Sequence, residues 1–160
     1  MSAEHYFHRG FEVPVEMSDV ELYKKNFKIR GGDFDTAGEV STEIKSILKS
    51  VGINSDVVRR VSIATFEAEM NVVIHAEKGE LEFVLTPEDI KITVNDKGKG
   101  IEDIEQAMQE GYSTATDEMR EMGFGAGMGL PNIKKNSNAF ELTSQVGEGT
   151  CLKIRIKHKN

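Results

Sequence analysis

Residues 55–76, SDVVRRVSIATFEAEMNVVIHA, decide the fold of this chain. The stretch opens with a Ser-Asp pair that suits a helix start, and Gly79 lies just beyond its end, so we expect one long helix. Its apolar residues cover most of the helix circumference, which is typical of a largely buried helix. Glu67, Asn71 and His75 nevertheless recur at intervals of four and therefore share one stripe of that helix. Because buried polar groups need partners, this stripe faces either a polar cleft or a closed hydrogen-bond network.

Periodicity on both sides of this helix predicts an α+β fold. Upstream, Thr36 and Glu39 match a capping box, so we expect an amphipathic helix over residues 36–51. Downstream, residues 97–127 show no steady period, and we expect a long functional loop with one short helix near 102–110. The other predicted elements are strands at 23–30, 81–85, 90–94, 140–146 and 150–156 and a helix at 128–137. Consecutive hairpins of this kind predict a two-layer α/β sandwich whose sheet is mixed but mostly antiparallel.

Length and composition indicate one globular domain. The chain has 160 residues, of which 38% are hydrophobic and 29% charged. We expect residues 1–22 to form an N-terminal arm, mobile or docked on a partner, and residues 23–160 to form the domain. The net charge of −7 disfavours nucleic acid and anionic membranes as partners, because phosphate binding needs a basic surface. Cys151 is the single cysteine, and neither a signal peptide nor a membrane-length apolar run is found, so we expect a cytoplasmic protein.

Asp96 is a second candidate site residue, because it opens the segment DKGKG directly after a predicted strand. Gly98 and Gly100 allow the backbone of this segment to approach a ligand closely. The carboxylate suits a hydrogen bond from an exocyclic amine, such as that of adenine. A plain turn is the alternative interpretation, because Asp and Gly are common turn residues.

Residues 123–131, GFGAGMGLP, form the third candidate segment. Glycine at every second position frees backbone N–H groups to face an anion, and the helix that follows adds its N-terminal dipole. The pattern therefore favours phosphate binding, with a flexible hinge as the alternative. The spacing is not that of a Walker A loop or of the dinucleotide-binding fingerprint, and the catalytic loop of eukaryotic protein kinases is absent from the sequence.

In this order, the three segments resemble the Bergerat family of ATP-binding domains, which includes the ATPase domains of histidine kinases. The matching motifs are Glu67 and Asn71 four apart on a helix, Asp96-x-Gly98-x-Gly100, Gly125-x-Gly127-x-Gly129-Leu130, and Gly147-x-Gly149-Thr150 before the last strand. Each motif is weak alone, but four in the right order and context make the resemblance specific. It covers about residues 28–157.

The resemblance implies ATP and Mg²⁺ as cofactors and assigns a role to each motif. Asn71 would hold the Mg²⁺, Glu67 would act as the catalytic base, and Asp96 would bind the adenine amine. Thr150 would support the adenine pocket. The backbone donors to the phosphates would be Gly125, Gly127, Met128 and Gly129, and the remaining residues expected to line the nucleotide site are His75, Gly98, Gly100, Ile101 and Leu130.

Within that family, the chain looks most similar to the short serine/threonine kinases of bacterial sigma-factor regulation, especially their switch-kinase branch. The resemblance implies a regulatory protein partner, either a scaffold domain like the anti-sigma antagonists or a sigma factor, and it leaves a homodimer open. An ATP-gated partner-binding module without efficient phosphoryl transfer is the alternative, and an ATP hydrolase is a weaker one. Some relatives carry an arginine before the Gly-Met-Gly step, where this chain has Gly125 and Ala126, so that Arg120 or Lys134 would have to supply the charge.

Overall fold

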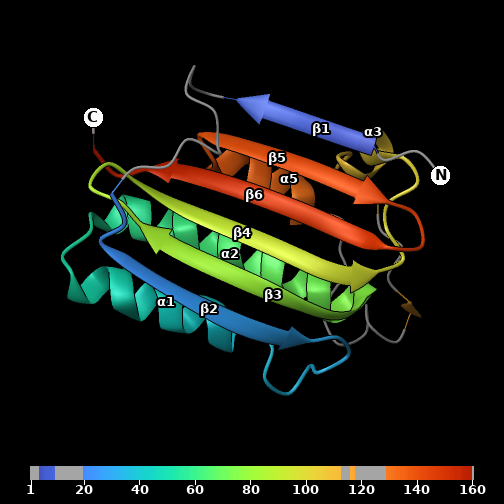
Figure 1. The fold of residues 1–160 in the computed structure, drawn as a ribbon, viewed down its shortest axis with the longest axis horizontal. Coiled ribbons are helices and arrows are strands. Elements are labelled where there is room, and N and C mark those ends of the chain that lie inside the picture. The colour runs from blue at the N-terminus through green and yellow to red at the C-terminus, as the bar shows by residue number, and fades with distance from the viewer. Residues whose placement is uncertain (1–3, 10–19, 113–115, 118–128, 160) are drawn as a thin grey trace.

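The computed structural model describes residues 4–9, 20–112, 116–117 and 129–159, the first of these ranges by its backbone alone. Among these residues the chain forms one six-stranded sheet and four helices (Figure 1). The strands are β1 (Glu4–Arg9), β2 (Tyr23–Arg30), β3 (Ala76–Leu85), β4 (Asp89–Gly98), β5 (Ala139–Gln145) and β6 (Gly149–Lys157). The helices are α1 (Glu39–Ser50), α2 (Ser55–His75), α3 (Ile104–Ala107) and α5 (Gly129–Asn136).

The sheet has the order β1-β5-β6-β4-β3-β2, and each pair of neighbouring strands is antiparallel. The α+β sandwich is therefore confirmed, but the expected mixed sheet is antiparallel throughout the described residues. For two of these pairs the reason is local, because short turns join β3 to β4 and β5 to β6, and a tight hairpin can only connect antiparallel strands.

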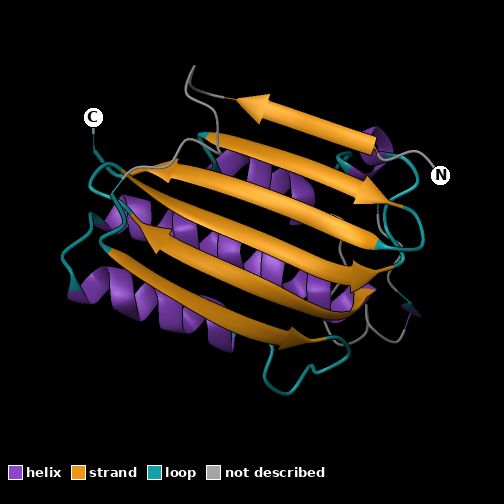
Figure 2. Ribbon diagram, in the orientation of Figure 1, coloured by secondary structure: helices purple, strands orange, loops and turns teal. Residues whose placement is uncertain are grey.

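The helices α1, α2 and α5 lie on one face of this sheet (Figure 2). Between them and the sheet is the hydrophobic core, which contains Ile44, Leu48, Val61, Ala64, Phe83, Ile92, Ile133 and Ile154, all with no exposed surface. The long helix over residues 55–76 is thus confirmed as α2, and most of its circumference is buried as its apolar residues predicted. Burial of this kind is the main favourable contribution to folding.

The N-terminal segment contains a strand that the sequence did not predict. Residues Glu4–Arg9 pair with β5, from Glu4 opposite Ser144 to Arg9 opposite Ala139. An edge strand needs only backbone hydrogen bonds along one side, so it can form without the alternating pattern by which strands are recognised. The proposed division between an arm over residues 1–22 and a domain over residues 23–160 stays a prediction.

The capping box predicted at the start of α1 is wrong. The Thr36 hydroxyl instead donates to the carboxylate of Asp33 at 2.8 Å, and α1 begins later, at Glu39. Gly38 occupies the N-cap position with φ of 98°, a left-handed conformation that suits glycine, and no side chain of its own segment caps the helix.

Glu69 of α2 caps α1 in place of the predicted box. Its Oε2 atom accepts hydrogen bonds from the backbone N–H groups of Gly38 at 2.9 Å and Val40 at 3.3 Å, and its Oε1 atom accepts one from Ser41 at 3.1 Å. Only 2% of Glu69 is exposed. A single buried carboxylate therefore satisfies the free N–H groups of α1 and joins the two helices.

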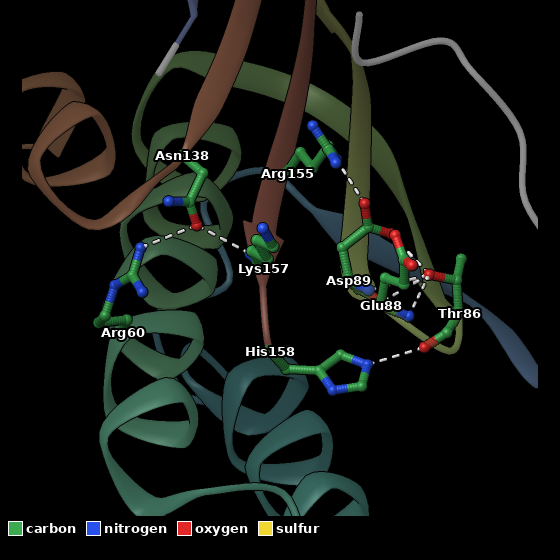
Figure 3. A network of polar contacts seen from close by, with 8 residues as sticks. All are labelled: Arg60, Thr86, Glu88, Asp89, Asn138, Arg155, Lys157 and His158. Carbon is green, nitrogen blue, oxygen red and sulfur yellow. Dashed lines mark hydrogen bonds and ion pairs between the residues drawn. The ribbon is translucent and has the colours of Figure 1, made fainter. Parts of the chain in front are cut away.

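A polar network joins the strand ends at the start of β4 and the end of β6 (Figure 3). The buried carboxylate of Asp89 accepts hydrogen bonds from the Arg155 guanidinium and from the Thr86 hydroxyl. Asn138 accepts one bond from the Arg60 side chain and another from the Lys157 backbone. This network fixes one end of the sheet and leaves the opposite end, where β4 finishes and β6 begins, for the candidate site.

Candidate functional site

One cavity of about 560 Å³ opens at the end of the sheet where β4 finishes and β6 begins. Its walls come from the C-terminal half of α2, the segment after β4, the first turn of α5 and the start of β6. It is lined by ten predicted site residues, namely Glu67, Asn71, His75, Asp96, Gly98, Gly100, Ile101, Gly129, Leu130 and Thr150. The other three, Gly125, Gly127 and Met128, lie outside the described residues. The polar stripe of α2 therefore faces a cleft, which decides between the two alternatives left open by the sequence.

Asp96 lies near the end of β4, with its carboxylate held against the start of β6. Its Oδ1 atom accepts a hydrogen bond from the Thr150 backbone N–H at 3.1 Å. Burial raises the pKa of this carboxyl, while hydrogen bonds from the backbone of Thr150 and Gly98 act in the opposite direction. The group is thus partly desolvated and keeps an acceptor for a ligand.

Gly149 permits this close approach of β6 to Asp96. A Cβ atom at position 149 would lie 2.1 Å from the Asp96 carbonyl oxygen, and the glycine has φ of 143°. Any side chain here would push β6 away from Asp96, so packing against Asp96 explains the second glycine of the Gly147-x-Gly149-Thr150 motif.

Ser144 supports this wall through hydrogen bonds to two of its residues, and the sequence analysis did not identify it. Its hydroxyl accepts a hydrogen bond from the Ile101 N–H at 2.8 Å and lies 2.9 Å from the Thr150 hydroxyl oxygen. It therefore connects the segment after β4 with the start of β6. Its place in the strand could have identified it. Phe140, Leu142 and Ser144 alternate along the strand and point inward, and a buried serine hydroxyl needs a hydrogen-bond partner.

On the opposite wall, the first turn of α5 lies directly against the polar stripe of α2. A Cβ atom on Gly129 would be 3.1 Å from Asn71 Oδ1 and 3.4 Å from Glu67 Oε2. The Asn132 side chain donates a hydrogen bond to Glu67 Oε1 at 3.3 Å. Asn132 was also missed, although a polar residue between buried Pro131 and Ile133 is a sign that its side chain has a partner.

His75 completes the α2 stripe and is neutral near pH 7. Burial lowers its pKa to about 4, and the positive charge of Lys99 acts in the same direction. A neutral imidazole can both donate and accept a hydrogen bond, so His75 offers a polar contact to a ligand without adding charge to the cavity.

Comparison with known families decides what kind of site this is. A model of the histidine kinase-like ATPase domain family matches residues 33–156. The chain belongs to this family. The resemblance that the motifs predicted is thereby confirmed, and ten of the predicted site residues of this ATPase domain line one cavity.

Individual relatives of this ATPase domain include a serine/threonine-protein kinase and several anti-sigma F factors. Serine/threonine-protein kinase RsbT of Bacillus subtilis (strain 168) is 31% identical over 110 residues, which are 66% of this chain and 77% of that protein. An anti-sigma F factor of Clostridium beijerinckii is 33% identical over 110 residues, 65% of this chain and 72% of the relative. Another, from Caldanaerobacter subterraneus subsp. tengcongensis, is 33% identical over 99 residues, 59% of this chain and 66% of the relative.

Two further observations concern the described part of the ATPase domain. No helix there has the length and apolar character to cross a membrane. No group of three or more His, Cys, Asp or Glu side chains there is arranged to enclose a metal ion.

Proposed function

We propose that this chain is an ATP-binding serine/threonine protein kinase of the anti-sigma regulatory type. It transfers the γ-phosphate of ATP to a serine or threonine of a small regulatory protein. One observation carries the proposal: a carboxylate and a carboxamide one helical turn apart on α2 face the same cavity as a partly desolvated aspartate on β4. The kinase and anti-sigma relatives support the same class of activity.

The cavity suits a nucleotide. Its volume of about 560 Å³ is in the range of small-molecule sites, and polar groups stand on otherwise apolar walls. In this proposal Asp96 accepts a hydrogen bond from the adenine amine, and the Ser144–Thr150 pair holds that wall in place. The triphosphate lies toward Gly129, where the start of α5 offers backbone N–H groups.

The cavity wall formed by α2 and the start of α5 suits magnesium. Mg²⁺ usually keeps several waters and takes one or two protein ligands together with phosphate oxygens. Asn71 presents an amide oxygen beside the start of α5, and it is the residue that would hold the ion. When bound there, the ion would neutralise part of the phosphate charge.

Glu67 is the proposed catalytic base. It accepts the proton of the partner's hydroxyl group, and the hydroxyl oxygen bonds to the γ-phosphorus of ATP. The bond from that phosphorus to the β–γ bridging oxygen breaks, and ADP leaves with its electron pair. Glu67 is one helical turn from Asn71, so the base and the metal ligand face one reaction centre. Positioning and charge stabilisation supply most of the catalysis in such a reaction.

The partner is proposed to be a scaffold domain of the anti-sigma-antagonist type, with a sigma factor as the other candidate. A homodimer and a cytoplasmic location belong to the same proposal. Of the residues expected to replace the missing arginine, Lys134 lies half-buried in α5, and Arg120 is outside the described residues.

The test is transfer of radiolabel from γ-labelled ATP to purified anti-sigma-antagonist-type domains, with Mg²⁺ present. We expect label on a serine or threonine of one such domain. Glu67→Gln should reduce the transfer rate by about 10²–10⁴-fold while the Kd for ATP changes little, because general-base catalysis is lost and binding is not. Glu77→Gln is the matched control, since Glu77 is exposed and outside the cavity wall.

Two outcomes would count against the kinase. Tight ATP binding without transfer to any candidate domain would support the ATP-gated binding module instead. Equal transfer rates for Glu67→Gln and Glu77→Gln would remove Glu67 from the reaction.

A further inference from the structure

The hydrogen bond between α5 and the proposed base is the contact with the clearest functional consequence in the described structure. Asn132 donates from Nδ2 to Oε1 of Glu67 across the interface between α5 and α2, and the two residues are 65 positions apart in sequence. Glu67 reaches the cavity through a side chain with three rotatable bonds. Holding one of its oxygens fixes the direction in which the other oxygen points, so the acceptor for a proton is oriented in advance.

The backbone on both sides of Asn132 is itself held in place. Pro131 and Ile133 are buried, and Ile133 has no exposed surface, so the helix cannot rotate without breaking the core. Asn136 donates to the carbonyl oxygen of Asn132 at 2.8 Å, which adds a second constraint one turn further along. The Asn132 carboxamide therefore stands on a rigid element rather than on a loop.

The same turn of α5 also reaches the proposed metal ligand. Gly129 lies against both Asn71 and Glu67, and Asn132 follows it within one turn. A shift of α5 would thus change the surroundings of the base and of the metal ligand together.

We propose that Asn132 is a positioning residue for this reaction. It orients the Glu67 carboxylate, and catalysis therefore depends on the position of the first turn of α5 against α2. The inference rests on the proposed kinase function. Asn132 acts through Glu67, and no contact between Asn132 and the nucleotide is required.

Other charged groups share the surroundings of Glu67 and bear on any test that varies pH. Glu67 also lines a shallow groove between α1 and α2, where Lys45 is the other charged residue. The remaining charged or titratable side chains of the main cavity are His75, Asp96, Lys99, Glu102, Asp103 and Tyr112. A test must therefore separate the effect of Glu67 from theirs.

The contact itself is tested by NMR on the full chain without nucleotide. The side-chain amide signal of Asn132 should move with pH as its partner carboxylate titrates, and this movement should vanish in Glu67→Gln while the other titrating groups remain. A signal that moves equally in both proteins, or in neither, would overturn the proposal. This measurement does not depend on kinase activity, so it can fail or succeed separately from the proposed function.

The catalytic role is tested by steady-state kinetics with the acceptor domain identified by radiolabel transfer. Asn132→Ala should lower kcat by about 10–100-fold and change the KM for ATP by less than about twofold, because a hydrogen bond to a charged catalytic group is lost. Lys135→Ala is the matched control, since it truncates an exposed side chain of the same helix that pairs with Glu110 and not with Glu67. Equal kcat values for the two variants would overturn the proposal.

A third variant distinguishes orientation from general disruption of the helix. Asn132→Asp keeps the size of the side chain and places a second carboxylate beside Glu67. Like charges repel, so the pH at which activity falls on the acid side should rise by about one unit, while a merely structural role leaves it in place. An unchanged acid limb in this variant would contradict direct contact between positions 132 and 67.

Discussion

Replacing Glu69 by glutamine should destabilise the protein strongly, although the two side chains have nearly the same shape. The carboxylate accepts three backbone N–H groups at the start of α1, those of Gly38, Val40 and Ser41. A carboxamide has one oxygen, so at least one of these N–H groups loses its acceptor and meets an NH₂ group. An unsatisfied buried donor costs about 1–3 kcal/mol, and the bonds that remain are no longer charge-assisted.

The expected loss in unfolding free energy is about 2–3 kcal/mol for Glu69→Gln, after allowing for the smaller desolvation cost of the neutral group. For a chain of 160 residues each kcal/mol lowers Tm by roughly 2–4 °C, so Tm should fall by about 5–10 °C. Urea unfolding followed by circular dichroism measures the free energy, and a thermal scan measures Tm.

Glu39→Gln is the control for this experiment. Glu39 is in the first turn of the same helix but is exposed, so the same chemical change should cost only about 0.3–1 kcal/mol through the helix dipole. Hydrogen exchange at Gly38, Val40 and Ser41 should accelerate in Glu69→Gln alone. If the two variants lost equal stability, the cap would have no special importance and the reasoning would be refuted.

Three further changes follow from the described contacts. Asp89→Ala should cost about 3–5 kcal/mol in urea unfolding, because it leaves the buried Arg155 cation without its carboxylate, whereas a loss below about 1 kcal/mol would contradict this. His75 has a lowered pKa of about 4, so the unfolded chain binds its proton first as pH falls; stability should drop by about 1–2 kcal/mol from pH 7 to pH 5, and His75→Gln should remove that part of the drop. Gly149→Ala should weaken ATP binding by at least about tenfold in calorimetry, because the new methyl group would displace β6 from Asp96; unchanged affinity would argue against the adenine site.

Much of the cavity lining was predictable because the motifs that contribute to it are local in sequence. Glu67, Asn71 and His75 share a stripe on any helix, whatever surrounds it, so one period identified three residues of the cavity wall. Asp96 and its two glycines form a similarly local pattern. The residues that support these groups were harder to find: the partners of Ser144 and Asn132 are 43 and 65 residues away in sequence, and no local period encodes such pairs.

The start of α1 shows that local sequence patterns also fail to predict long-range contacts in the fold. Thr36 and Glu39 fit the sequence pattern of a capping box. In the structure, however, the Thr36 hydroxyl donates to Asp33, and the backbone N–H groups at the start of α1 donate to Glu69, which lies 28 to 31 residues further along the chain. The strand Glu4–Arg9 was likewise invisible, because its pairing with β5 joins opposite ends of the chain through backbone atoms that every sequence has.

The sequence by itself determined the α+β class, the long buried helix with its polar stripe, and the membership in an ATP-binding family, because each is encoded by short-range periods and motifs. Only the tertiary structure decided that the stripe faces a cavity, that a carboxylate of α2 caps α1, and that Asn132 contacts Glu67. Those features depend on which side chains meet across the packed layers, and the packing of distant segments is settled by the whole chain at once.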